Sequence, residues 1–164
     1  MQTKVIAILA VLFSTLVAGD VVTYKQMSLE LATEAAQLSV AACRKKGYQV
    51  SAVVVDRAGN LQVALRDVYA SRFTTEIAQR KANAVILSGT DSGTFRKNRE
   101  DIRQELNHIS GLIVMEGGLP ITSGGSLLGA IGVSGAPGGN LDADCAKSAL
   151  KSLEERLIFA GEEE

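Results

Sequence analysis

The sequence has no tryptophan, one histidine and two cysteines among its 164 residues. Aromatic side chains make up 4% of the chain, so platforms on which nucleic-acid bases stack are not expected. The formal net charge of −1 provides no general attraction to nucleic acid either. His108 and two distant cysteines match no standard zinc spacing, and no Gly-x-Ser-x-Gly motif is present. We therefore predict neither a nucleic-acid-binding protein nor a hydrolase.

What the chain does contain is typical of a packed globular domain. Hydrophobic residues make up 46% and charged residues 21%, far from the composition of a disordered chain. A length of 164 residues suits one domain, because one hydrophobic core can serve that length. We find no linker or internal repeat, and we predict a single domain over residues 20–164.

The first nineteen residues have the pattern of a secretory signal peptide. Lys4 is followed by an uncharged apolar run from Val5 to Val17 and then by two small residues, Ala18 and Gly19. The run is shorter than the roughly 20 residues that span a bilayer, so a permanent membrane anchor is not expected. We predict that residues 1–19 are removed and that the protein is exported, to the periplasm or outside the cell.

The two cysteines, Cys43 and Cys145, would then lie in a compartment that permits disulfides. Both fall in apolar helical patterns, which leaves two interpretations. They are either buried structural thiols or the two ends of a single disulfide. The Cα–Cα distance that decides between them cannot be read from a sequence.

The periodicity of apolar residues predicts the order of secondary structure. Helical spacing with end signals indicates helices over 28–47, 73–87, about 98–106 and 140–157. A β-branched run, a turn and an extended pattern over 50–65 predict a hairpin. Three short apolar segments separated by glycine-rich turns predict an antiparallel meander of strands at 112–115, 119–122 and 127–133. The expected fold is therefore α+β, with a five-stranded antiparallel sheet flanked by helices.

His108 and Met115 are the first candidates for a binding site. A neutral imidazole and a thioether are both common axial ligands of haem iron. Each residue also has a simpler interpretation. His108 follows the expected short helix and could bind its last carbonyl groups, and Met115 ends an apolar run and could belong to the core.

A second set of candidates consists of cations. Arg96, Arg99 and Arg103 lie close together in the sequence and could hold carboxylates or phosphates, or they could form a solvated helix face balanced by neighbouring acids. Lys81 lies in an otherwise apolar helical segment. Its ammonium group could point into a pocket or extend outward to solvent.

Several segments resemble the GlcG-like, HbpS-like haem-degrading family. They are residues 56–61 (DRAGNL), 78–82 (AQRKA), 117–121 (GGLPI), 129–139 (GAIGVSGAPGG) and 142–146 (DADCA). The resemblance runs from about Ser28 to Leu157, and the combined C-terminal string is specific. It implies a profilin-like five-stranded antiparallel sheet between helices and assembly into homo-oligomers of up to eight subunits.

The resemblance also implies haem as the cofactor, with slow oxidative haem breakdown or redox sensing in some family members. Other members accompany glycolate or diol metabolism. Our leading hypothesis is an exported haem-binding protein, with His108 as the axial ligand and the arginines facing the propionates. The alternative is a protein that binds a small carboxylate metabolite through Lys81 and the loops. Both describe a binding protein more than an efficient enzyme.

Overall fold

The computed structural model describes residues 21 and 23–159, so the predicted signal peptide lies outside the described residues. The elements are α1 (Leu29–Lys45), β1 (Ser51–Asp56), β2 (Leu61–Arg66), α2 (Phe73–Ser88), α3 (Ser92–Asn98), η1 (Glu100–Ile102), α4 (Arg103–Leu106), β3 (Gly118–Ser123), β4 (Ser126–Ser134), α5 (Gly139–Ser152) and α6 (Glu154–Phe159). Among these described residues, we find no helix with the length and apolar character needed to cross a bilayer.

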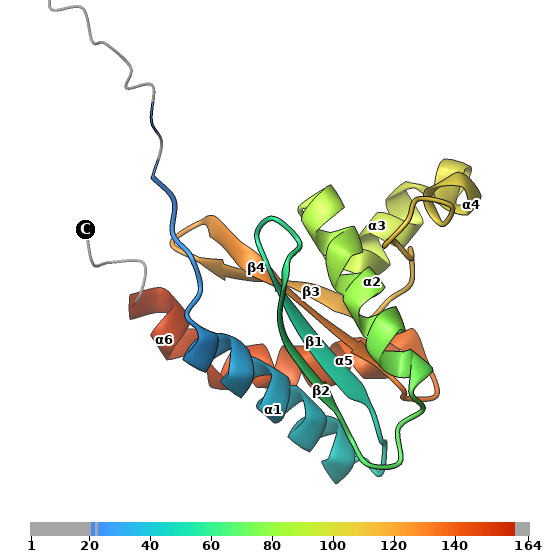
Figure 1. Cartoon of the computed structure of the whole chain (residues 1–164), viewed down its shortest axis with the longest axis horizontal. Helices are drawn as coiled ribbons and strands as arrows, with labels where there is room; N and C mark the ends of the chain where they lie inside the picture. The colour runs from blue at the N-terminus through green and yellow to red at the C-terminus, as the bar shows by residue number, and fades with distance from the viewer. Residues whose placement is uncertain (1–20, 22, 160–164) are drawn as a thin grey trace, which may run out of the picture.

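The described strands form one antiparallel sheet of four strands in the order β2-β1-β4-β3 (Figure 1). The α+β class is confirmed, but the predicted five-stranded sheet is wrong. β1 lies between β2 and β4, and its residues Ser51 to Asp56 pair with Ser134 to Gly129. After β2 the chain therefore leaves the sheet and re-enters it as the edge strand β3, and β4 then fills the position between β3 and β1.

The segment predicted as a fifth strand, residues 112–115, is a loop whose backbone groups bond locally. The Val114 N–H donates to the side-chain oxygen of Asn107 at 2.7 Å, and the Met115 N–H donates to the Ile113 carbonyl at 3.0 Å. Val114 is buried against Ala84 and Phe95. The apolar pattern therefore reflects packing under α2 and α3, because periodicity does not reveal which partner buries a short apolar run.

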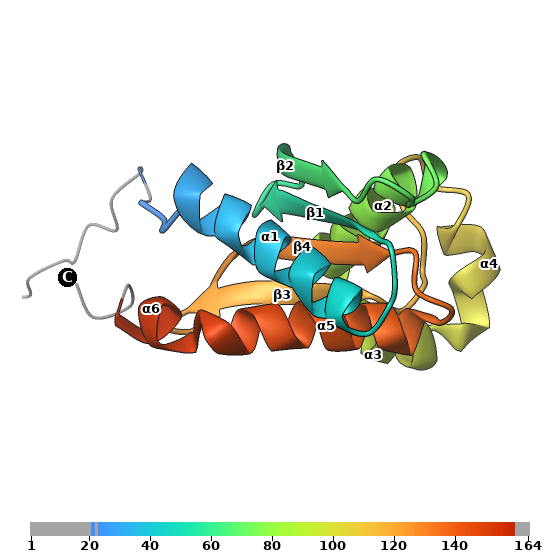
Figure 2. The ribbon, with the colours of Figure 1, turned by 90° about the horizontal axis from the view of Figure 1, so that it is seen from below.

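Helices cover both faces of the sheet (Figures 1 and 2). α1 and α5 pack together on one face, over a core that includes Val54, Ile121 and Ile131. α2 alone packs against Val53 and Val55 on the other face. The small helices α3 and α4 lie at one end of the molecule, and the β3–β4 turn and α6 lie at the opposite end.

Glycine allows α2 to lie very close to the sheet. A Cβ on Gly132 of β4 would be 1.9 Å from the Ala78 carbonyl oxygen, and one on Gly118 of β3 would be 2.4 Å from the Lys81 carbonyl oxygen. Neither distance is sterically possible without movement of a backbone. These glycines in strands are therefore required by helix–sheet contact.

The structure also decides between the two interpretations of the cysteines, buried thiols or a disulfide. Cys43 on α1 and Cys145 on α5 form a disulfide with a Cα–Cα distance of 5.3 Å, and both residues are fully buried. The bond fastens the two helices on the same face of the sheet to each other.

The region after α2 is more helical than the sequence indicated. The segment between the predicted helices over 73–87 and 98–106 contains α3, because the Asp91 carboxylate accepts a hydrogen bond from the Thr94 N–H and caps that helix. The short helix predicted over 98–106 is divided between η1 and α4.

Candidate functional site

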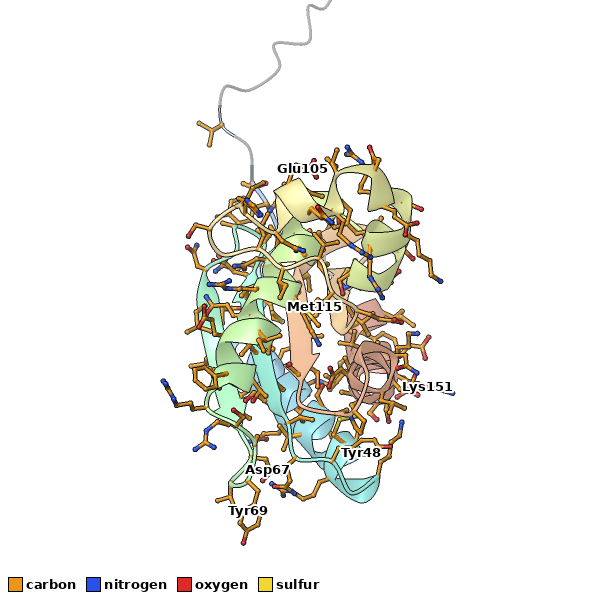
Figure 3. All side chains as sticks on the ribbon, turned by 90° about the vertical axis from the view of Figure 1, so that its right-hand side faces the viewer. Tyr48, Asp67, Tyr69, Glu105, Met115 and Lys151 are labelled. Carbon is orange, nitrogen blue, oxygen red and sulfur yellow. A yellow bond between two sulfur atoms is a disulfide. The ribbon has the colours of Figure 1, made fainter. Side chains whose placement is uncertain are left out.

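A surface cavity of about 330 Å³ lies where α3, α4 and the start of α5 meet. Its lining comprises Arg96 of α3, Arg103 of α4, Asn107, residues 114–116, and Gly139 and Asn140 of α5. Figure 3 views the molecule from this end, with Met115 labelled. The fold thus brings together three of the predicted site residues, Arg96, Arg103 and Met115.

The two arginines of this cavity are available to a ligand. In the part of the chain that the structure describes, neither the Arg96 nor the Arg103 guanidinium has an ion-pair or hydrogen-bond partner. Arg96 is exposed and Arg103 is partly buried. Two unpaired guanidiniums lining one cavity favour an anionic ligand, because guanidinium–carboxylate hydrogen bonds are strong and directional.

The first turn of α5 adds backbone donors to the same cavity. Gly138, which precedes the helix, provides no side-chain cap, so the N–H groups of Gly139 and Asn140 are not capped by it. The N-terminus of a helix carries a partial positive charge. The start of α5, whose first turn also carries the Asp142 carboxylate, and the two guanidiniums therefore line one space.

Two further lining residues define the character of the cavity. Met115 is 44% exposed, so its thioether is reachable and the residue is not part of the core. Glu116 contributes a carboxylate beside the two arginines. The charged side chains of the lining sum to a single positive charge, which suits an anionic ligand.

The other two surface candidates lie apart from this cavity. His108 is exposed and does not line the cavity, although it follows the lining residue Asn107. The Arg99 guanidinium donates to the Asp101 carboxylate at 3.3 Å and lines a neighbouring cavity with Phe95. Arg99 therefore matches the alternative of a helix-face cation balanced by an acid.

Lys81 takes neither of the two orientations considered for it. Its side chain is 2% exposed, and its Nζ donates to Asp142 Oδ2 at 2.8 Å and to the Val133 carbonyl at 3.0 Å. The other carboxylate oxygen of Asp142 accepts the Ala136 N–H at 2.9 Å. Burial raises the pKa of the Asp142 carboxyl, against the opposing effects of the Lys81 ammonium and these hydrogen bonds. The Lys81 ammonium is thus engaged inside the protein and does not line the cavity of the two arginines.

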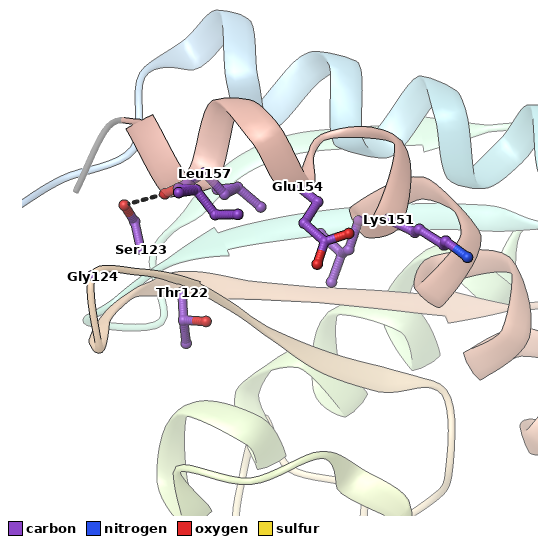
Figure 4. A pocket seen from close by; sticks show the side chains of 8 residues that line it. Thr122, Ser123, Gly124, Lys151, Glu154 and Leu157 are labelled. Carbon is purple, nitrogen blue, oxygen red and sulfur yellow. Dashed lines mark hydrogen bonds between the residues drawn. The ribbon is translucent and has the colours of Figure 1, made fainter. Parts of the chain in front are cut away.

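A larger cavity of about 550 Å³ lies at the opposite end of the molecule, between the β3–β4 hairpin and α5–α6 (Figure 4). Apolar side chains such as Leu150 and Ile158 line it together with Lys151 and Glu154. The Ser123 hydroxyl donates to the Leu157 carbonyl at 2.5 Å and fastens α6 to the hairpin. The sequence candidates do not line this cavity, and its charges are mixed in sign.

Sequence reasoning did not assign five further lining residues to the smaller cavity: Asn107, Val114, Glu116, Gly139 and Asn140. It also missed Asp142 as the partner of Lys81, although a lysine in an apolar run implies a buried carboxylate elsewhere. Within residues 21 and 23–159, no three histidine, cysteine or acidic side chains gather as metal ligands.

Residues 27–151 match the sequence profile of the family described as "Haem degrading protein HbpS-like". A search among curated proteins finds no match. Solved structures share the fold. A double mutant of HbpS from Streptomyces reticuli is 34% identical with a TM-score of 0.77, over 83% of this chain and 92% of that chain.

Two more distant structures agree with this fold. The protein ORFY of Klebsiella pneumoniae is 22% identical with a TM-score of 0.76, over 84% of this chain and 97% of that chain. PduOC, solved as a complex with haem, is 21% identical with a TM-score of 0.68, over 78% and 95% of the respective chains.

Proposed function

Because the chain belongs to the HbpS-like family of haem degrading proteins, we propose that it is an exported haem-binding protein. The observation that carries the proposal is the cavity in which two unpaired guanidiniums, of Arg96 and Arg103, lie with the Met115 thioether. A haem presents two carboxylates at one edge of an apolar ring. Guanidiniums suit the carboxylates, and a thioether is a known haem-iron ligand. The residues present therefore fit the group.

The size of the cavity suggests how much of a haem it would hold. A volume of about 330 Å³ is near the lower end of the roughly 300–1,000 Å³ usual for small-molecule sites. The cavity would hold the propionate edge, leaving the rest of the ring to lie outside it. His108, on the exposed surface next to Asn107, remains a candidate axial ligand alongside Met115.

Bound haem would supply the iron and its redox chemistry. The residues of this chain would hold the carboxylates, orient the ring edge and limit access of water to it. The arginines and Met115 of the lining suit holding a ligand, so we propose binding as the main role. Slow oxidative haem breakdown and redox sensing are extensions of the same proposal.

Export is part of the proposal, and the Cys43–Cys145 disulfide supports it. Disulfides persist in oxidising compartments and are rare in the cytosol. We also propose a homo-oligomer, in which a second subunit would cover the part of the haem that the cavity leaves outside.

A small carboxylate metabolite is the second candidate ligand, favoured by the limited volume of the cavity. If the ligand is such a metabolite, Arg96 and Arg103 hold its carboxylate. Lys81, the residue first considered for this role, is already paired with Asp142.

The deciding experiment is a hemin titration of the protein, followed by absorbance in the Soret region. We expect a saturable endpoint and a fall in affinity of at least about tenfold in Arg96→Gln/Arg103→Gln, since each lost charge-assisted bond contributes about 1.5–3 kcal/mol. Lys97→Gln, which removes an exposed cation of α3 outside the cavity lining, should bind as the wild type does. The Soret positions of His108→Ala and Met115→Leu would identify the axial ligand.

Nonsaturating, featureless absorbance would exclude the haem proposal. Thermal shift with small carboxylates would then test the second candidate, because a ligand that binds only the folded state raises its stability.

A further inference from the structure

One side of the cavity wall consists of two chain segments that lie far apart in the sequence. One segment, residues 114–116, precedes β3, and the other, Gly139 and Asn140, begins α5. The segments contact each other, because a Cβ on Gly139 would lie 2.6 Å from the Glu116 carbonyl oxygen. The packing behind the two segments determines how firmly this contact is held.

The Lys81–Asp142 ion pair lies directly behind this wall. A Cβ on Gly117 would be 2.8 Å from Lys81 Nζ and 3.0 Å from Asp142 Cβ, so the backbone following Glu116 packs against the pair. Gly117 has φ +124°, a conformation that favours glycine. The Gly117 carbonyl accepts the Val133 N–H at 2.9 Å, and the Val133 carbonyl accepts from Lys81.

The same pair also holds the second segment. Asp142 belongs to α5, two residues after Asn140, and its Oδ1 accepts the Ala136 N–H in the loop that leads into the helix. One carboxylate oxygen of Asp142 therefore accepts a hydrogen bond from Lys81 of α2, and the other accepts one from the Ala136 N–H of the β4–α5 loop.

We infer that the Lys81–Asp142 pair is the positioning element of the ligand cavity: it fixes residues 115–117 and the start of α5 relative to α2. This inference rests on the proposed function for the identity of the ligand. Neither residue touches the ligand. Their effect passes through the placement of Met115, Glu116, Gly139 and Asn140, which line the cavity.

The test compares two ion pairs that the same chain provides. Removing one partner of a buried pair leaves an unpaired buried charge and can prevent folding, whereas apolar replacement of both partners is often tolerated. The test variant is therefore Lys81→Met/Asp142→Leu. The control is Arg44→Met/Asp67→Leu, which removes a pair between α1 and the loop after β2, away from the cavity, whose aspartate is buried and whose arginine is exposed.

Two measurements are made on both variants: hemin affinity, and amide hydrogen exchange of the peptides that cover 114–118 and 135–141. We expect the test variant to bind hemin at least about tenfold more weakly and to exchange faster in these two segments. The control should keep wild-type values for both. The single variant Asp142→Asn, which leaves the Lys81 ammonium without its carboxylate partner, should show the same two changes.

Wild-type affinity and wild-type exchange in Lys81→Met/Asp142→Leu would overturn the inference and make the pair purely structural. If the wild-type protein does not bind hemin, the proposed function fails on its own. The exchange measurement, which needs no ligand, then still decides whether the pair positions the two segments.

Discussion

Cys43 and Cys145 are bonded to each other across 102 residues of chain, and the bond joins α1 to α5. Both residues are fully buried on their helices. The bond closes a long loop in the unfolded chain, so it contributes stability chiefly by restricting the unfolded state.

We predict that Cys43→Ala/Cys145→Ala lowers the free energy of unfolding by about 3–5 kcal/mol, the range for a loop of this length. Urea denaturation with and without reductant measures the effect. Reductant should lower the denaturation midpoint of the wild type toward that of the variant and leave the variant unchanged. A wild-type midpoint that is independent of reductant would contradict the disulfide.

The Arg44–Asp67 pair predicts a pH dependence of stability. The Arg44 guanidinium donates to both Asp67 oxygens, at 2.9 and 2.8 Å, and holds the pKa of Asp67 below its usual value. A depressed carboxyl pKa contributes stability above the unfolded pKa of about 3.9, and this contribution is lost as the pH falls through the lower folded value. The stability difference between wild type and Asp67→Asn should therefore be constant above about pH 5 and shrink below about pH 4.

Urea denaturation between pH 2.5 and 7 measures this difference. Asp101→Asn, which removes an exposed partner of Arg99, is the control and should show little effect at any pH. A stability difference between wild type and Asp67→Asn that stays the same at low pH would contradict the prediction.

Close packing of α2 on the sheet predicts that Gly132→Ala is destabilising. The added Cβ would lie 1.9 Å from the Ala78 carbonyl oxygen, so α2 has to move away from β4. We expect a loss of about 1–3 kcal/mol, as for other overpacked cores, measured by thermal or urea denaturation.

Gly93→Ala is the comparison for that variant, because its nearest neighbours are the flexible Glu116 side chain and the Asp91 carboxylate. Gly93→Ala should lower the free energy of unfolding far less than Gly132→Ala does. Equal stability of Gly132→Ala and the wild type would show that the helix–sheet contact is looser than described.

The proposed carboxylate-binding role of Arg96 and Arg103 predicts selectivity among porphyrins. A porphyrin with free carboxylates should bind at least about tenfold more tightly than its dimethyl ester, because masking removes the charge-assisted hydrogen bonds. The Arg96→Gln/Arg103→Gln variant should bind the porphyrin and its dimethyl ester with equal affinity. Fluorescence titration of a metal-free porphyrin and its ester gives both affinities, and equal binding by the wild type would rule out this carboxylate contact.

The sequence by itself determined the class of the fold and much of its element order. Helical spacing from Leu31 to Ala42 and the β-branched run before Asp56 are local signals, and the structure contains α1 and β1 there. The sequence also singled out the arginines and Met115, as separate candidates that only the structure brings to one cavity. Local periodicity reports which residues are buried and does not report what buries them.

Only the tertiary structure decided the rest. Residues 112–115 pack under α2 and α3 and do not extend the sheet, Cys43 meets Cys145, and Lys81 meets Asp142 across 61 residues. Each outcome is a contact between residues far apart in the sequence. Such contacts depend on how helices and sheet stack, and the close approach that Gly118 and Gly132 permit brings Lys81 of α2 within reach of Asp142.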